Sequence, residues 1–221
     1  MDQKFIPLKN FHTFSEKEMI ERSEDFLNLM STRRTIRTFS SQPIPQKVIK
    51  NAIKIAGTAP SGANFQPWFF AVIKNPKIKG VIRNEAEKEE KEFYTKRASV
   101  EWLKALEQFG TDEHKPFLEK APYLIVVFEK KFDKDTKNEI IKHYYTKESV
   151  GIAAGMLITA LHNSGIATLT HTPSPMNFLN KILDRPKNEK PFLIIVAGIP
   201  QETTLVPNIK RKEFHEIASV F

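Results

Sequence analysis

The chain of 221 residues carries 34 Lys and Arg against 26 Asp and Glu, a formal net charge of +8, and no cysteine. This length is typical of one domain or two small ones, and 40% apolar residues suffice for a core without disulfide or metal support. The lack of cysteine excludes disulfides, thiol nucleophiles and thiolate metal sites, and it fits a reducing compartment. Lysines alternate with glutamates instead of forming a single-sign stripe, which argues against nucleic-acid binding.

Two features argue against a membrane protein. The N-terminus has no apolar run of the kind found in signal peptides. The longest apolar stretch, near residues 150–161, is well short of the ~20 residues that span a bilayer. We therefore expect a soluble, cytoplasmic protein with no membrane partner.

The first third of the chain predicts two helices and a strand. Ser15 and Glu18 form a capping box, followed by apolar residues at helical spacing up to residue 30. A second helix begins at Pro45 and ends near Gly57, with an apolar stripe between them. Residues 68–73 then predict a strand, which Asn75-Pro76 ends.

The middle of the chain is highly charged. Residues 81–106 have a helical pattern with few apolar positions, and residues 109–116 predict a loop that leads into a short helix. The apolar run 123–128 then has the length and composition of a fully buried strand.

Residues 149–163 are apolar on nearly all sides and predict a buried helix, in which Gly151 and Gly155 allow another backbone to approach closely. Strands are expected at 167–172 and 192–197. Strands and helices are therefore interspersed, which favours a single α/β or α+β domain over residues 1–221, built around one sheet. The polar stretch after residue 200 has no clear core face and is expected to fold onto something else, such as a second subunit.

Several catalytic motifs are absent. The sequence lacks Gly-x-Gly-x-x-Gly, the dinucleotide-binding motif of the Rossmann fold. Residues 57–62 have the glycine spacing of a phosphate-binding loop, but the Lys-Ser/Thr pair that such a loop requires is missing. No serine lies in a Gly-x-Ser-x-Gly elbow, and no two histidines have metal-ligand spacing, so no metal site is predicted. Because the side chains offer no evident catalytic group, a cofactor is expected to supply the chemistry.

Two motifs remain. Three guanidinium groups follow the first predicted helix, in the motif Arg33-Arg34-Thr35-Ile36-Arg37. They can bind a phosphate, or they can simply be solvated charges that interact favourably with the dipole at the C-terminal end of the helix. Residues 59–68 form a turn-rich stretch that suits the wall of a flat ring system or an ordinary loop before a strand. Each motif alone leaves both interpretations open.

Taken together and in order, the two motifs resemble the nitroreductase family. Further stretches extend the resemblance to its iodotyrosine deiodinase branch over almost the whole chain, at residues 56–63, 143–145, 172–173, 185–186 and 206–212. This resemblance implies a nitroreductase-like fold, with a central mixed, mainly antiparallel sheet flanked by helices. It also implies a domain-swapped homodimer with a C-terminal arm, and FMN bound at the subunit interface.

The resemblance also implies roles for individual residues. The positions that match FMN contacts are Arg33, Arg34, Thr35, Ile36, Arg37, Ser61, Thr170, His171, Thr172 and Arg211. Ser61 matches a position contributed by the partner subunit. The hydroxyl at the Thr172 position bonds flavin N5 in this branch and favours one-electron steps, so Thr172 is the expected catalytic residue. At two places this sequence departs from the family's pattern. His171 stands where threonine is common, and Thr35-Ile36 replaces the usual Ser-Val pair.

Substrate contacts are implied in the same way. Glu90, Tyr94 and Lys115 match residues that recognise an amino-acid zwitterion, and Glu90 and Tyr94 share a helix face because they are four residues apart. The backbone N–H of Ala63 matches a donor to the substrate phenolate. Residues 84–117 would form a mobile lid, since their sparse apolar residues offer little burial to offset ordering.

The expected function is therefore reductive dehalogenation of halotyrosine by FMN. An alternative is a general NAD(P)H-dependent nitroreductase or quinone reductase acting on other aromatic compounds, and a basic nucleic-acid-binding protein without flavin is a remote third. The external reductant is not identified by any of these motifs.

Overall fold

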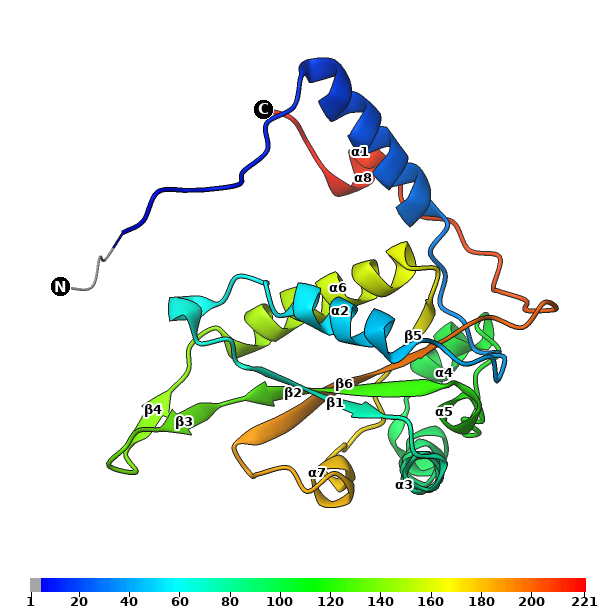
Figure 1. The fold of residues 1–221 in the computed structure, drawn as a ribbon. Coiled ribbons are helices and arrows are strands. Elements are labelled where there is room, and N and C mark those ends of the chain that lie inside the picture. Colours follow the sequence, from blue (N-terminus) through cyan, green and yellow to red (C-terminus); the bar gives the residue numbers. More distant parts are fainter. Residues whose placement is uncertain (1–4) are drawn as a thin grey trace. The chain divides into compact units, whose positions relative to one another are not determined.

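The computed structural model describes residues 5–221, which divide into two compact units, residues up to Arg33 and residues Arg34–Phe221 (Figure 1). That residues 1–221 form a single domain stays a prediction. In the N-terminal unit, helix α1 (Glu16–Ser31) begins at the predicted capping box. The Ser15 backbone N–H donates to Glu18 Oε2 at 2.9 Å, and none of the α1 residues is buried.

The larger unit is built on a four-stranded sheet. Its strands are β1 (Trp68–Ile73), β2 (Tyr123–Lys130), β5 (Ala167–His171) and β6 (Glu189–Gly198). They lie in the order β1-β2-β6-β5, and each neighbouring pair is antiparallel. A parallel bridge joins Thr35 to Thr168 on the free edge of β5. The prediction of a mixed, mainly antiparallel sheet is confirmed.

Strand β2 has an apolar core on each of its faces, as its continuous apolar run predicts. Leu124, Val126 and Phe128 belong to one cluster, whereas Tyr123, Ile125 and Val127 belong to the other. Because successive side chains of a strand point to opposite faces, a central strand covered on both sides must be apolar throughout.

Helices cover both faces of the sheet (Figure 1). On one face lie α2 (Gln46–Ala56) and α6 (Thr146–Asn163), and Gly57 caps α2 as predicted. The other face is covered by α3 (Pro76–Glu92), α5 (Phe117–Lys120) and α7 (Phe178–Ile182).

Helix α6 is buried on one side only in the single chain. Val150, Leu157 and Leu161 are fully buried, but Ile152 is 47% exposed, and a Cβ atom added at Gly151 or Gly155 would meet nothing within 4 Å. The expectation of burial on nearly all sides is therefore wrong for one chain. The apolar outer face of α6 is free to pack against another molecule.

The charged helical segment is two helices instead of one. Asn75 caps α3, with its Oδ1 accepting from the Lys77 N–H at 2.9 Å, so Asn75-Pro76 both ends β1 and begins α3. A single π-helical turn, η2 (Phe93–Arg97), follows α3, and α4 (Val100–Glu107) restarts with Ser99 as its cap. No residue of η2 or α4 is buried.

Sequence reasoning missed the short elements. They are η1 (Gly62–Asn64), the hairpin of β3 (Phe132–Lys134) and β4 (Ile140–Lys142), α7, and α8 (Phe214–Ile217). Elements of three to five residues carry too little periodicity to be predicted, and contacts elsewhere in the fold stabilise them. Among the described residues, no helix combines the length and apolar content that a membrane span requires.

Candidate active site

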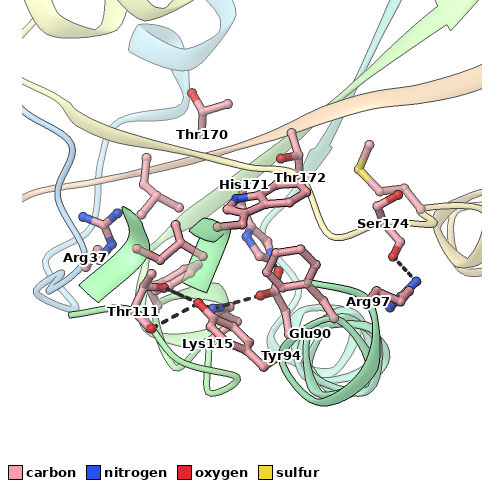
Figure 2. A pocket seen from close by; sticks show the side chains of 16 residues that line it. Arg37, Glu90, Tyr94, Arg97, Thr111, Lys115, Thr170, His171, Thr172 and Ser174 are labelled. Atoms are coloured by element: carbon pink, nitrogen blue, oxygen red, sulfur yellow. Dashed lines mark hydrogen bonds and ion pairs between the residues drawn. The ribbon is translucent and has the colours of Figure 1, made fainter. Parts of the chain in front are cut away.

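A cavity of about 720 Å³ lies beside the edge strand β5 (Figure 2). Its walls come from three parts of the chain: the end of β5 and the loop after it, the segment from α3 to α5, and Arg37. Seven of the predicted site residues line it, namely Arg37, Glu90, Tyr94, Lys115, Thr170, His171 and Thr172. This volume is in the range of small-molecule sites.

The three predicted zwitterion-binding residues are brought together in this cavity. Lys115 Nζ lies 3.2 Å from Glu90 Oε2 and 5.4 Å from the centre of the Tyr94 ring. The Tyr94 hydroxyl donates to the Thr111 carbonyl at 3.1 Å, and Lys115 Nζ also donates to Thr111 Oγ1 at 3.3 Å. Figure 2 shows the Glu90–Lys115–Thr111 interactions as one connected group.

This group is largely withdrawn from water. The side chain of Lys115 is 4% exposed and that of Glu90 14% exposed. Burial raises the pKa of Glu90, and the nearby charge of Lys115 partly opposes that rise. Burial also raises the pKa of the Tyr94 phenol. A buried carboxylate paired with a buried ammonium makes a site that favours ligands able to satisfy both charges.

A second ion pair fixes the backbone at Lys115. Glu87 Oε1 accepts from the Lys115 backbone N–H at 2.6 Å, and Arg83 Nε lies 2.7 Å from the same oxygen. Because Arg83 and Glu87 are four apart on α3, they share the helix face that carries Glu90 toward the cavity. Helix α3 therefore positions both partners of the Glu90–Lys115 pair.

Strand β5 presents its residues in alternation. Thr170 and Thr172 are exposed, whereas His171 between them is buried, as expected when successive side chains point to opposite sides. The His171 ring packs edge-on against Phe117, and its Nε2 lies 3.9 Å from Glu90 Oε1. Burial, together with the charge of Lys115, lowers the pKa of His171 to about 3.

The arginine motif is held against β5 by its backbone. The Ile36 N–H donates to the Thr168 carbonyl at 3.1 Å, and Arg37, one residue on, reaches the cavity. Burial lowers the pKa of Arg37. Arg34 is turned toward the C-terminal stretch, where it donates to the Pro207 carbonyl, and the Ile36 side chain is part of the core. Arg33 belongs to the N-terminal unit.

Ser61, Ala63 and Arg211 do not line the cavity. Ser61 precedes η1 and Ala63 lies within it. The η1 segment lies toward the end of the sheet that carries the β3–β4 hairpin, whereas α4 and α5 cover the opposite end (Figure 1). A single chain therefore does not bring these two residues to the Glu90–Lys115 pair.

The turn at η1 is tightly built. Ala63 has a left-handed backbone with φ of +48°, and Ser61 Oγ accepts from the Gln66 N–H at 3.0 Å. A Cβ at Gly62 would come within 3.0 Å of the Tyr144 carbonyl, so only glycine fits there without a shift. Residues 143–145 and the stretch 56–63 are therefore in direct contact.

Sequence reasoning missed several residues that line the cavity. Phe93, Trp102 and Phe117 supply aromatic walls, and Arg97 closes one side by donating to the Ser174 carbonyl at 2.6 Å. Phe93 and Trp102 pack edge to face with ring centres 4.9 Å apart. These residues carry no motif of their own, and their roles depend on how α3, η2 and α4 fold back on β5.

Comparison with known proteins agrees with this geometry. A sequence model of the nitroreductase family matches residues 30–199. An iodotyrosine deiodinase from Haliscomenobacter hydrossis is 52% identical over 98% of this chain and 97% of its own length. The chain belongs to the iodotyrosine deiodinase branch of the nitroreductase family.

Other members of the family show the same relationship. Human iodotyrosine deiodinase 1 is 39% identical over 96% of this chain and 73% of its own length. A crystal structure of oxidised iodotyrosine deiodinase bound to FMN and 3-iodo-L-tyrosine is similar with a TM-score of 0.76 and 29% identity, over 88% of this chain and 100% of that chain. A nitroreductase-like protein from Streptococcus mutans shares the fold, with a TM-score of 0.65 and 20% identity over 90% of this chain and 99% of that chain.

Proposed function

We propose that this chain is an FMN-dependent reductive dehalogenase that acts on halotyrosine. The observation that carries the proposal is the buried Glu90–Lys115 pair in the same cavity as Tyr94, Arg37 and Thr172. The family relationship supports it, since the relatives that match over nearly the whole chain are named iodotyrosine deiodinases.

Substrate recognition follows from the charges of the cavity. A zwitterionic amino acid carries both an ammonium, which can replace Lys115 beside Glu90, and a carboxylate, which can replace Glu90 beside Lys115. The exchange leaves no buried charge without a partner, whereas a ligand with only one of the two charges would. The paired site therefore favours an amino acid over a simple phenol.

The rest of the substrate is aromatic, and aromatic residues are present to receive it. Phe93, Tyr94 and Trp102 line the same cavity as the ion pair. We assign to Ala63 of a second copy the backbone N–H that binds the phenolate. The strained left-handed backbone at Ala63, held by the close approach of Tyr144 to Gly62, is a fixed feature on which such a donor can be placed.

The residues around the cavity fit part of an FMN molecule. Arg37 and Arg34 offer guanidinium groups that suit a phosphate and a polar ring edge, and Thr170 and Thr172 offer hydroxyls on the exposed side of an edge strand. We assign Arg33 and Arg211 to the same cofactor. Ile36 can contact FMN only through its backbone, because its side chain is part of the core.

When bound, FMN supplies the electrons for dehalogenation. The overall change adds two electrons and one proton to the substrate, replaces the carbon–halogen bond with carbon–hydrogen, and releases halide. With FMN bound, the Thr172 hydroxyl would donate a hydrogen bond to the flavin and would favour transfer of one electron at a time. Glu90, Tyr94 and Lys115 hold the substrate, and Arg37 helps hold the cofactor.

We propose that the active protein is a homodimer. Three features of the single chain support this: the apolar outer face of α6, the absence of Ser61 and Ala63 from the lining of the cavity, and exposed apolar residues near the C-terminus. Leu205 is 92% exposed, and no residue of α8 is buried. A second copy would cover these surfaces and bring Ser61 and Ala63 to the other cavity, with the C-terminal arm crossing between subunits.

We also propose that residues 84–117 act as a lid. The ends of this segment, at Ala86 and Phe117, pack into the core, whereas neither η2 nor α4 between them contains a buried residue. Little apolar burial therefore opposes opening of this central part. The bond from Arg97 to the Ser174 carbonyl ties the segment to the loop after β5 in the closed form. Closure over substrate would exclude water from the reacting atoms.

One experiment tests the assignment. The purified holoprotein is titrated anaerobically with 3-iodotyrosine while flavin fluorescence and absorbance are followed, and the complex is then reduced with dithionite. Quenching by iodotyrosine followed by iodide release is the expected result. A yellow protein that does not respond to iodotyrosine but oxidises NAD(P)H with nitroaromatic compounds would instead indicate a general nitroreductase.

A further inference from the structure

The ring of His171 lines the cavity, and the reaction outlined above does not use it. The residue is 7% exposed, and Nε2 is the single buried side-chain nitrogen or oxygen without a hydrogen-bond partner among the described residues. Buried polar atoms are almost always paired, so an unpaired one facing a binding cavity indicates where a ligand atom belongs.

The surroundings of Nε2 define the ligand atom. Glu90 Oε1 is 3.9 Å away, which is too far for a direct hydrogen bond. An atom about 2.8 Å from each of the two would make an angle of about 90° between them, which suits one nitrogen that donates two hydrogen bonds. The position between His171 and Glu90 thus fits a donor with at least two N–H bonds.

The charge state of His171 agrees with an accepting role. Burial and the nearby Lys115 hold the pKa of His171 at about 3, so the ring is neutral at neutral pH. A neutral imidazole protonated on Nδ1 offers Nε2 as an acceptor. Beside an ionised Glu90, two acceptors then face the same point, and a cationic donor satisfies both.

We propose that His171 is a specificity-determining residue whose Nε2 accepts a hydrogen bond from the substrate α-ammonium, alongside the Glu90 carboxylate. This inference rests on the proposed function and extends it. A threonine at this position would have a shorter side chain that would not reach the same point. The chain should therefore be more selective for a free primary amine than a variant with threonine at this position.

The test compares two ligands on the FMN-loaded protein. One is 3-iodotyrosine, and the other is 3-(4-hydroxy-3-iodophenyl)propanoate, which lacks only the amino group. Dissociation constants are measured by flavin fluorescence quenching for wild type, His171→Leu, His171→Gln and His171→Thr. Flavin content and circular dichroism of each variant verify that it is folded.

We expect His171→Leu and His171→Thr to weaken iodotyrosine binding about tenfold, as for the loss of one hydrogen bond, and to change binding of the des-amino ligand less than twofold. His171→Gln, which keeps an acceptor, should recover part of the affinity. Equal losses for both ligands, or no loss in any folded variant, would overturn the proposal. If His171→Leu fails to bind FMN, the His171→Thr variant gives the same comparison.

The failure of this inference can be told apart from failure of the proposed function. If wild-type protein binds neither ligand, the assignment as a halotyrosine dehalogenase is wrong and the role of His171 falls with it. If wild type binds and dehalogenates iodotyrosine, but its preference over the des-amino ligand is the same in all folded variants, only the role of His171 is wrong.

Discussion

Replacement of Glu90 by Gln removes the negative charge of the cavity while keeping the size of the side chain. In the proposed complex this carboxylate holds the substrate ammonium, so the variant should bind 3-iodotyrosine more weakly but retain FMN. None of the residues assigned to FMN lies on α3, which carries Glu90.

The size of the effect follows from burial. The Glu90 side chain is only 14% exposed, so water screens its charge poorly. A hydrogen bond to a charged group in such a setting contributes about 2–3 kcal/mol, which corresponds to a loss of about 30- to 150-fold in affinity. The matched control is Glu92→Gln on the same helix, since the Glu92 side chain is 51% exposed and pairs with Lys96 at 3.0 Å. That change should alter affinity less than about fivefold.

The assay is fluorescence titration of the holoproteins with 3-iodotyrosine and with its des-amino analogue. Glu90→Gln should strongly weaken the binding of 3-iodotyrosine and should change the binding of the des-amino analogue little. The pH dependence adds a second readout: because burial raises the pKa of Glu90, wild-type affinity should fall as acid protonates this carboxyl, and the variant should lack that fall. Unchanged iodotyrosine affinity, or equal losses for both ligands, would refute the zwitterion site.

Three further predictions concern other parts of the molecule. Thr172→Val should retain FMN and substrate but slow iodide release about tenfold or more, measured by single-turnover reduction; an unchanged rate would remove Thr172 from the reaction. A Cβ atom added at Gly155 meets no atom of its own chain within 4 Å, so the Gly155→Leu chain should fold, yet sedimentation velocity should show loss of the dimer, and FMN should be lost with it. If this variant is still an FMN-loaded dimer, the outer face of α6 is not the dimer interface. For stability, the pKa of His171 is about 3 in the folded protein against 6.5 for the unfolded chain, so the unfolded state binds more protons between these values. The free energy of unfolding should therefore drop as pH falls below 6.5, by about 2 kcal/mol at pH 5 relative to pH 7, and urea titrations of His171→Thr should show a drop smaller by that amount.

The sequence by itself determined the elements with strong local signals. Ser15 and Glu18 mark the start of α1, and Pro45 and Gly57 flank α2, because caps and fixed backbone angles act within a few residues. The run at 123–128 identified the central strand, because both faces of β2 are covered. The arginine motif and the residues near Ala63 identified the family before any contact was known.

Tertiary structure alone decided how these pieces meet. Glu90 and Lys115 are 25 positions apart in the chain, and only the return of the chain from α4 to α5 places their charged groups 3.2 Å from each other. The burial of His171 depends on Phe117 and on the alternation of β5, so its unpaired Nε2 could not be seen in the sequence. The outer face of α6 likewise looks like core in sequence, because periodicity reports that a face is apolar and not which molecule covers it.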